Sequence, residues 1–150
     1  MECELCSSLK ENKFLVYETK HWKVFLHTKD QRCLGRCVVT LRRHAGDIAE
    51  LNKEELLDFA QLARDLESAS KKAFRATMFN WTCLMNNAYQ KKPYNPHVHW
   101  HFRSRYDHEV KFGGLTFKDE LFGHHYSGDE KYIVSDDILD KITKALSEKL

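Results

Sequence analysis

Three histidines alternate with apolar residues in the segment 97–101, whose sequence is HVHWH. Alternate side chains of a β-strand share a face, so the imidazoles would line one side while Val98, Trp100 and Phe102 pack into a core on the other. At about 3.3 Å per residue, neighbouring histidines stand about 7 Å apart and the outer two about 13 Å apart, so one metal ion can join neighbours but hardly all three. The pattern predicts a polar site on a buried strand rather than a solvent-facing edge.

Histidines in this arrangement suit two chemistries. A free imidazole has a pKa of about 6.5 and is largely neutral at physiological pH, so its lone pair is available for nucleophilic attack. Alternatively, His97 and His99 bind a catalytic zinc that activates water, as in a metallohydrolase. That alternative needs a third ligand and leaves the cysteines near the start of the chain without a role.

Cys3 and Cys6 form a C-x-x-C pair at the start of the chain. Such a pair is a redox pair, two incidental thiols or half of a zinc site, and its spacing alone does not decide among them. A structural zinc needs four ligands, normally thiolates and imidazoles. His44 and His97 are candidates for the other two, because each lies at the end of a predicted strand that a short N-terminal arm can reach. For His44 the alternative is a surface histidine beside two arginines.

Polar and basic residues accompany the three histidines in the sequence. Asn86 ends the strand predicted to precede them, and Asn95 lies two residues before His97. Five basic residues can supply positive potential for phosphate groups, although each taken singly is an ordinary surface charge. They are Arg36, Lys91, Lys92, Arg103 and Arg105.

Several strands and one long helix must position these side chains. Runs of aromatic and β-branched residues between turn signals predict the strands. The predicted strands are residues 14–18, 22–26, 36–41, 79–85 and 97–103. The first two are joined by a short turn through Thr19 and Lys20 and form a hairpin, and the third runs into the basic turn 42–44.

Helical periodicity begins at Asn52, which can cap a long helix together with Glu55 three residues later. Ser135 opens a second, C-terminal helix with an acidic first turn. Residues 107–134 are expected to be irregular, with Gly113-Gly114 as the clearest break. The predicted fold is therefore α+β, an antiparallel sheet of about five strands with one long helix and a C-terminal helix.

Length and composition fit one soluble domain. With 150 residues and 42% hydrophobic content, the chain is long enough for a single core. We expect one domain over residues 1–150, with its centre at about residues 3–106 and residues 107–150 as a C-terminal extension. The formal net charge is only +2, which excludes the basic stripe of a DNA- or RNA-binding protein and favours a small phosphorylated ligand.

The N-terminus and the cysteine usage indicate a cytoplasmic protein. The first residues have neither the basic nor the apolar region of a signal peptide, and no run approaches the length of a membrane span. Five cysteines are an odd set, which favours reduced thiols or metal ligation over a disulfide framework.

The segment 95–106, NPHVHWHFRSRY, resembles the signature of the histidine triad (HIT) superfamily, in which a His-x-His-x-His strand follows a strand that ends in Asn. The basic turn 42–44 and the order hairpin, strand, helix, two strands also resemble that family. The resemblance covers about residues 3–106 and implies a HIT-like fold. In the tail, residues 116–117, 122–123 and 126 resemble a prokaryotic-type branch described as diadenosine polyphosphate hydrolase-like.

The resemblance implies roles for individual residues and a homodimer. His99 would be the nucleophile that takes the nucleotidyl group at the α-phosphorus, His101 would hydrogen-bond the α-phosphate, and Asn86 would help to hold the site. A structural zinc would be bound by Cys3, Cys6, His44 and His97. The substrate stays open among dinucleoside polyphosphates such as diadenosine tetraphosphate, nucleoside phosphoramidates and nucleotidyl sulfates. A non-catalytic nucleotide-binding module is the alternative, because the same residues bind and react.

The chain departs from the family pattern at two places. Many members have a histidine after the glycine that opens the third strand, whereas this chain has Gly35-Arg36. Arg36 can meet phosphates with a fixed charge and a fork of donors, but it cannot act as a base. The usual Gln-Ser or Gln-Thr pair before the histidines is replaced by the segment 93–96, which contains Asn95, and the ribose position falls near His27-Thr28. Arg36, Asn95 and Thr28 are therefore the substrate-binding candidates.

Overall fold

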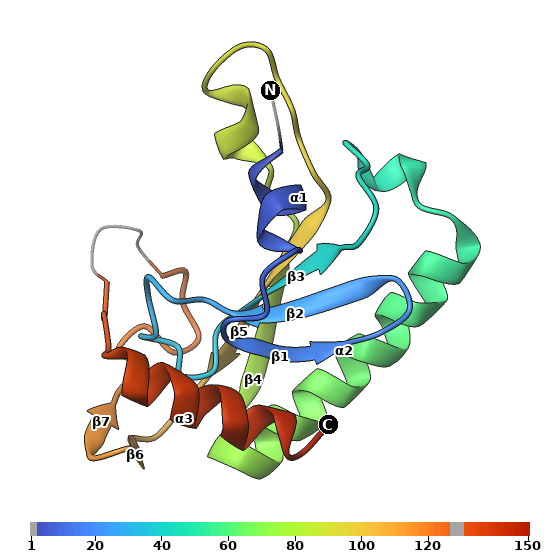
Figure 1. Cartoon of the computed structure of the whole chain (residues 1–150). Coiled ribbons are helices and arrows are strands. Elements are labelled where there is room, and N and C mark those ends of the chain that lie inside the picture. The colour runs from blue at the N-terminus through green and yellow to red at the C-terminus, as the bar shows by residue number, and fades with distance from the viewer. Residues whose placement is uncertain (1–2, 127–130) are drawn as a thin grey trace.

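A five-stranded sheet forms the centre of the computed structural model, which describes residues 3–126 and 131–150 (Figure 1). The strand order is β1-β2-β3-β5-β4, and every neighbouring pair is antiparallel. The strands are β1 (Leu15–Glu18), β2 (Trp22–Leu26), β3 (Cys37–Leu41), β4 (Met78–Thr82) and β5 (His99–Arg105). The predicted antiparallel α+β fold is confirmed, and so is the hairpin formed by β1 and β2.

The fourth strand is shorter than predicted, because β4 ends at Thr82 and does not continue to residue 85. Thr82 is its last residue paired with β5. The chain then turns into a short 3-10 helix, η2 (Asn86–Tyr89), so the prediction that Asn86 ends a strand was wrong.

The strand with the three histidines is displaced by two residues from its predicted range of 97–103. Val98 still hydrogen-bonds in an extended manner, since its carbonyl accepts from Leu41 N at 3.2 Å and its amide donates to Ala45 O at 2.9 Å. At the other end, β4 pairs with β5 as far as Arg105. The strand therefore continues two residues further because its partner does.

Both predicted helices are present. α2 (Lys53–Phe74) starts at Asn52, whose side chain accepts from Glu55 N while the Glu55 carboxylate accepts from Asn52 N. α3 (Asp136–Ser147) starts after Ser135. Two short elements, α1 (Glu4–Ser8) and η1 (Ile48–Glu50), escaped prediction because they span about one helical turn and show no periodicity. Within the described residues, no helix is both long and apolar enough to cross a membrane.

The hydrophobic core lies between the sheet and the two long helices. α3 contacts α2 and the first two strands, and it lies beside the C-terminal end of α2 (Figure 1). Leu62 and Leu66 of α2 and Ile142 and Leu146 of α3 are fully buried. Because the helices fill one side of the sheet, the opposite face of β5 is free to carry polar side chains.

The expectation of irregular structure over residues 107–134 was wrong in part. The segment contains a hairpin of β6 (Val110–Phe112) and β7 (Leu115–Phe117). Gly113 and Gly114 form its two-residue turn with φ values of +59° and +81°. Hairpin turns of this kind require positive φ at both central residues, so the pair of glycines marks a turn between strands.

Candidate functional site

The alternation of β5 separates a polar face from a core face, as the sequence predicts. Val98 and Phe102 are fully buried, and the Trp100 ring stacks on Phe59 of α2 with 4.7 Å between ring centroids. The odd-numbered residues share the opposite face. They are His97, His99, His101, Arg103 and Arg105.

His99 is held in one tautomer by its own strand. Its Nδ1 lies 2.7 Å from the carbonyl oxygen of His97. Because a carbonyl only accepts hydrogen bonds, Nδ1 carries the proton and donates it, and Nε2 keeps the lone pair. The side chain is half-buried. When the ring is neutral, this geometry leaves Nε2 available for attack.

His101 stands next to His99, with 5.0 Å between the ring centroids. Burial is the main cause that lowers the pKa of His101 to about 3, and charge interactions with His99, Arg103 and Arg36 lower it further. The ring is therefore neutral at physiological pH and can donate one hydrogen bond. Its Nδ1 is buried and has no hydrogen-bond partner within the described part of the chain.

Two thiols and two imidazoles meet beside the start of β5, where α1 lies against the segment that leads into the strand (Figure 1). The four ligand atoms of Cys3, Cys6, His44 and His97 all lie within 4.8 Å of one another. His97 Nδ1 is 3.3 Å from Cys3 Sγ and 3.4 Å from Cys6 Sγ. His44 Nδ1 is 3.5 Å from Cys6 Sγ. The structure thus brings together all four residues of the predicted metal site.

This cluster has the dimensions of a tetrahedral zinc site. With zinc bonds of about 2.3 Å to sulfur and 2.0 Å to nitrogen, tetrahedral geometry separates the two ligand atoms by about 3.5 Å. The observed sulfur–nitrogen separations match that edge. The other ring nitrogen of His97, Nε2, donates to Leu41 O at 2.8 Å, the type of outer hydrogen bond that orients a metal-binding imidazole. The residues present therefore fit a zinc ion.

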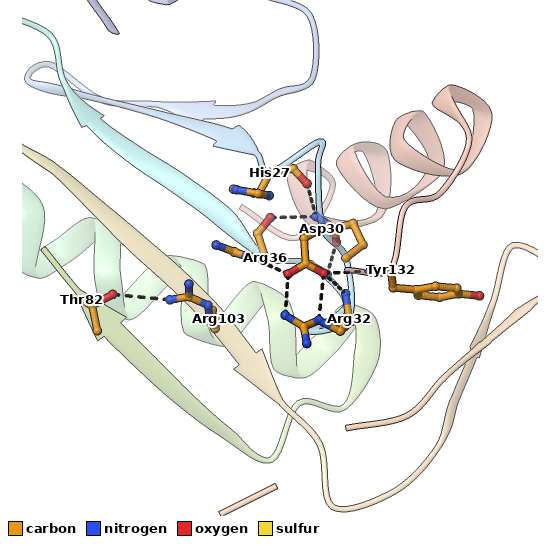
Figure 2. Close-up of polar contacts among 9 residues, drawn as sticks. His27, Asp30, Arg32, Arg36, Thr82, Arg103 and Tyr132 are labelled. Atoms are coloured by element: carbon orange, nitrogen blue, oxygen red, sulfur yellow. Dashed lines mark hydrogen bonds and ion pairs between the residues drawn. The ribbon is translucent and has the colours of Figure 1, made fainter. Parts of the chain in front are cut away.

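Arg36 is the residue immediately before β3. Because Cys37 pairs with Phe102, Arg36 lies opposite Arg103, the next residue of β5. Its Nη1 donates to Asp30 Oδ2 at 2.7 Å (Figure 2). Burial, followed by the charge of Arg103, lowers the pKa of Arg36, and burial also lowers the pKa of Arg103. Two guanidiniums therefore lie near His101, and Arg36 occupies a position suited to the predicted contact with phosphate.

A cavity of about 630 Å³ opens beside Arg103. Its lining includes Asp30, Arg32, Arg103, the acidic residues Asp119 and Glu120, and the aromatic residues Tyr126 and Tyr132. Cavities of this size hold small molecules. The polar face of β5 therefore borders, at Arg103, a hollow lined by basic, acidic and aromatic side chains.

A family model for the HIT domain matches residues 8–108 of the chain. The chain belongs to the HIT family. Among curated proteins, none is similar enough in sequence to count as a match to this HIT protein.

Solved structures share the fold of this HIT protein at low sequence identity. A hypothetical histidine triad nucleotide-binding protein from Sulfolobus tokodaii aligns with a TM-score of 0.71 and 16% identity over 98% of this chain and 91% of that chain. A zinc-bound histidine triad family protein from Mycobacterium smegmatis aligns with a TM-score of 0.66 and 16% identity over 97% of this chain and 94% of that chain. Diadenosine triphosphate hydrolase from Plasmodium falciparum aligns with a TM-score of 0.63 and 14% identity over 92% of this chain and 76% of that chain.

The remaining predicted residues of this HIT protein lie in loops and in η2. Asn86 is exposed at the start of η2, and Thr28 is exposed in the loop after β2. Asn95 is half-buried in the loop before the histidines. Lys91 and Lys92 are exposed in that same loop. The roles assigned to Asn86, Asn95 and Thr28 stay predictions.

Sequence reasoning missed two residues of the site, Asp30 and Tyr126, and assigned no role to His27. Asp30 pairs with Arg36, the Tyr126 ring lies 4.2 Å from the Arg103 guanidinium, and His27 is close enough to Arg36 and Asp30 for their charges to affect its pKa. Arg103 was noted only as a basic residue. Continuing the odd-numbered alternation past His101 would have placed it on the polar face, but the loop residues gave no signal of their own.

Proposed function

We propose that this HIT protein is a nucleotide hydrolase or transferase that cleaves at the α-phosphorus of a nucleotide conjugate, with His99 as the nucleophile. The observation that carries the proposal is the hydrogen bond from His99 Nδ1 to the carbonyl of His97. That bond fixes the ring and directs reactivity to Nε2, and no separate base is needed to free its lone pair.

The reaction proceeds in two displacements. In the first, the Nε2 lone pair of His99 bonds to the α-phosphorus, and the bond from phosphorus to the leaving group breaks, so the electron pair departs with that group. In the second, a water oxygen bonds to phosphorus, the phosphorus–nitrogen bond breaks, and its electron pair returns to Nε2. The water proton passes to solvent, and the ring is again neutral.

His101 supports this step by remaining neutral. Its depressed pKa of about 3 means that it meets the phosphate as a hydrogen-bond donor without a charge of its own. Preorganised donors aimed at developing charge are usually a large part of enzymatic rate enhancement. Since His101 lies directly beside His99, its ring can donate to an oxygen of a phosphorus bound there.

Cys3, Cys6, His44 and His97 would hold a structural zinc. Bound there, zinc supplies a cross-link between the N-terminal arm and the end of the polar strand, and it takes no part in attack on phosphorus. The metallohydrolase alternative is less well supported, because both ring nitrogens of His97 are already engaged, one with the thiols and the other with Leu41 O. No nitrogen of His97 is left to bind a metal shared with His99.

The relatives support the same class of reaction. One similar structure is a diadenosine triphosphate hydrolase, which fits cleavage of a phosphoric anhydride, and another is a histidine triad nucleotide-binding protein, which fits a nucleotide ligand. We propose a nucleotide as the ligand of this chain and a homodimer as its assembly, following the family resemblance and the frequency of two-fold symmetric dimers.

The test is the stereochemical course at phosphorus. A chiral α-phosphorothioate nucleotide conjugate is hydrolysed in labelled water, and two in-line displacements give retention, whereas direct attack by water gives inversion. His99→Ala should reduce kcat by about a thousandfold or more, as loss of a nucleophile does in other covalent enzymes. His108→Ala, beyond the end of β5, is the matched control and should retain activity. Inversion, or near-parent turnover by His99→Ala, would refute the mechanism; binding without turnover of any conjugate would identify a non-catalytic module.

A further inference from the structure

Arg103 follows His101 on the polar face of β5, and Arg36 lies opposite it. Little of either side chain is exposed to solvent. Arg103 is 9% exposed, and the Arg36 side chain is 12% exposed. Removing guanidiniums from water is costly unless negative charge compensates them. The charge balance around this pair therefore indicates whether a partner is missing.

The protein supplies too little negative charge here. One carboxylate, Asp30, accepts from Arg36 at 2.7 Å and from Arg32 at 3.2 Å, so it serves two guanidiniums (Figure 2). Arg103 has no carboxylate within ion-pair distance among residues 3–126 and 131–150. Its contacts are the Thr82 hydroxyl at 3.5 Å and the Tyr126 ring at 4.2 Å. The pair therefore carries an excess of positive charge.

Unused polar nitrogens gather at the same place. Arg36 Nε and His27 Nδ1 are both buried without a hydrogen-bond partner in the described part of the chain, and the charge of Arg36 acts on His27. Buried polar atoms in native proteins are nearly always paired, so two such nitrogens beside the arginine pair call for a ligand. A group with several acceptor oxygens and negative charge, such as a phosphate, satisfies both the nitrogens and the arginines.

The position of the arginine pair relates it to the reacting phosphorus. Successive odd-numbered residues of β5 are about 7 Å apart along the strand, in the order His99, His101, Arg103. A phosphorus attacked by His99 lies beside His101, and a further phosphate of the same chain then lies toward Arg103 and Arg36. The cavity of about 630 Å³ bordered by Arg103 extends the site beyond that point.

We propose that Arg36 and Arg103 form a second phosphate subsite, which binds the phosphates of the leaving group and makes polyphosphate-linked nucleotides the preferred substrates over nucleoside phosphoramidates. This inference rests on the proposed function. A phosphoramidate has an amine leaving group and brings no acceptor to the arginines, whereas a dinucleoside polyphosphate brings several. The subsite therefore acts on the choice of leaving group, and the histidines act on the α-phosphate.

Direct binding of inorganic tripolyphosphate to the full-length protein tests the subsite without requiring turnover. By calorimetry, Arg103→Gln should bind it about 10- to 100-fold more weakly than the parent, the loss expected for a hydrogen bond to a charged group. Arg103→Lys should recover part of the affinity. Arg64→Gln, on the exposed face of α2, is the matched control and should bind as the parent does. Equal affinity in the parent, Arg103→Gln and Arg64→Gln overturns the proposal.

A second readout excludes a general loss of structure. Burial, together with the charge of Arg36, holds the pKa of His27 at about 4. Tripolyphosphate bound nearby should raise that pKa in the parent protein but leave it unchanged in Arg103→Gln. NMR titration of the His27 ring measures the pKa with and without the ligand. In assays, the ratio of kcat/KM for diadenosine tetraphosphate to that for adenosine 5′-phosphoramidate should fall about 10- to 100-fold in Arg103→Gln.

The two proposals fail in different ways. If no conjugate is turned over yet tripolyphosphate binding depends on Arg103, the enzyme proposal fails and the subsite stands. If turnover proceeds with an unchanged substrate ratio in Arg103→Gln, the subsite fails and the enzyme stands. Adenosine 3′,5′-bisphosphate tests whether the second phosphate belongs to the sugar or to the leaving group. If Arg103→Gln weakens binding of this ligand but not of tripolyphosphate, the second phosphate is on the sugar and the leaving-group assignment is wrong.

Discussion

The cluster of Cys3, Cys6, His44 and His97 leads to a quantitative prediction about zinc. Each chain should hold one zinc ion, and replacing Cys3 and Cys6 together by serine should remove it, because two ligands are too few for a structural site. The change is small in volume and lies in the N-terminal arm. Loss of stability then reports the metal link and not damage to the core.

The magnitude follows from the distance in sequence that the metal bridges. Cys3 and His97 are 94 residues apart. A cross-link that closes a loop of about 100 residues contributes up to about 4–5 kcal/mol through loop-closure entropy. For a domain of about 150 residues, each kcal/mol changes Tm by about 2–4 °C, so the double variant should melt roughly 10–15 °C lower.

Metal content by mass spectrometry and melting by calorimetry check this prediction, with and without a chelator. Cys83→Ser is the matched control, because Cys83 is half-buried like Cys3 and Cys6 but lies outside the cluster. It should keep one zinc per chain. A double variant that retains a full equivalent of zinc would show that the assignment is wrong and would favour a metal bound by the histidines of β5.

Three further predictions concern acid stability, the long helix and assembly. Because burial lowers the pKa of His27 to about 4 and of His101 to about 3, the unfolded chain binds protons that the folded chain does not. Stability should therefore be full above about pH 6.5 and fall as the pH decreases toward about 4, and urea midpoints at pH 7 and pH 5 should differ less for His27→Gln than for the parent. Asn52→Ala removes the cap that accepts from Glu55 N and should lower the free energy of unfolding by about 1 kcal/mol, measured by urea denaturation. Light scattering at assay concentration should give the mass of two chains, and a monomer would contradict the proposed dimer.

The parts of the fold that depend on neighbouring residues were predictable from the sequence. The capping box of Asn52 and Glu55 is a local pattern, and α2 begins where that pattern places it. The alternation in β5 is also local, since it depends only on strand geometry, and it correctly assigned Val98 and Phe102 to the core. Zinc accepts few ligand types, which made Cys3, Cys6 and His44 candidates, and the family resemblance implied that they bind one zinc.

Features that depend on contacts between distant residues were not predictable. β4 ends with the pair of Thr82 and His101, two residues far apart in the sequence. Asp30 reaches Arg36 through a loop whose shape no periodicity encodes. Tyr126 meets Arg103 only because the segment after β7 folds back onto β5. These contacts require the tertiary structure, and they make up most of the proposed phosphate subsite.

The alternation of β5 also restricts how this protein can evolve. A substitution at one position changes either the polar face or the core, but the insertion or deletion of a single residue between His99 and Arg105 would exchange the two faces for every position beyond it. Guanidiniums would then point at α2, and Phe102 would point at the ligand. Lineages that share this strand are therefore free to diversify the chemistry of the odd positions by point mutation, while the number of residues in the strand must stay constant.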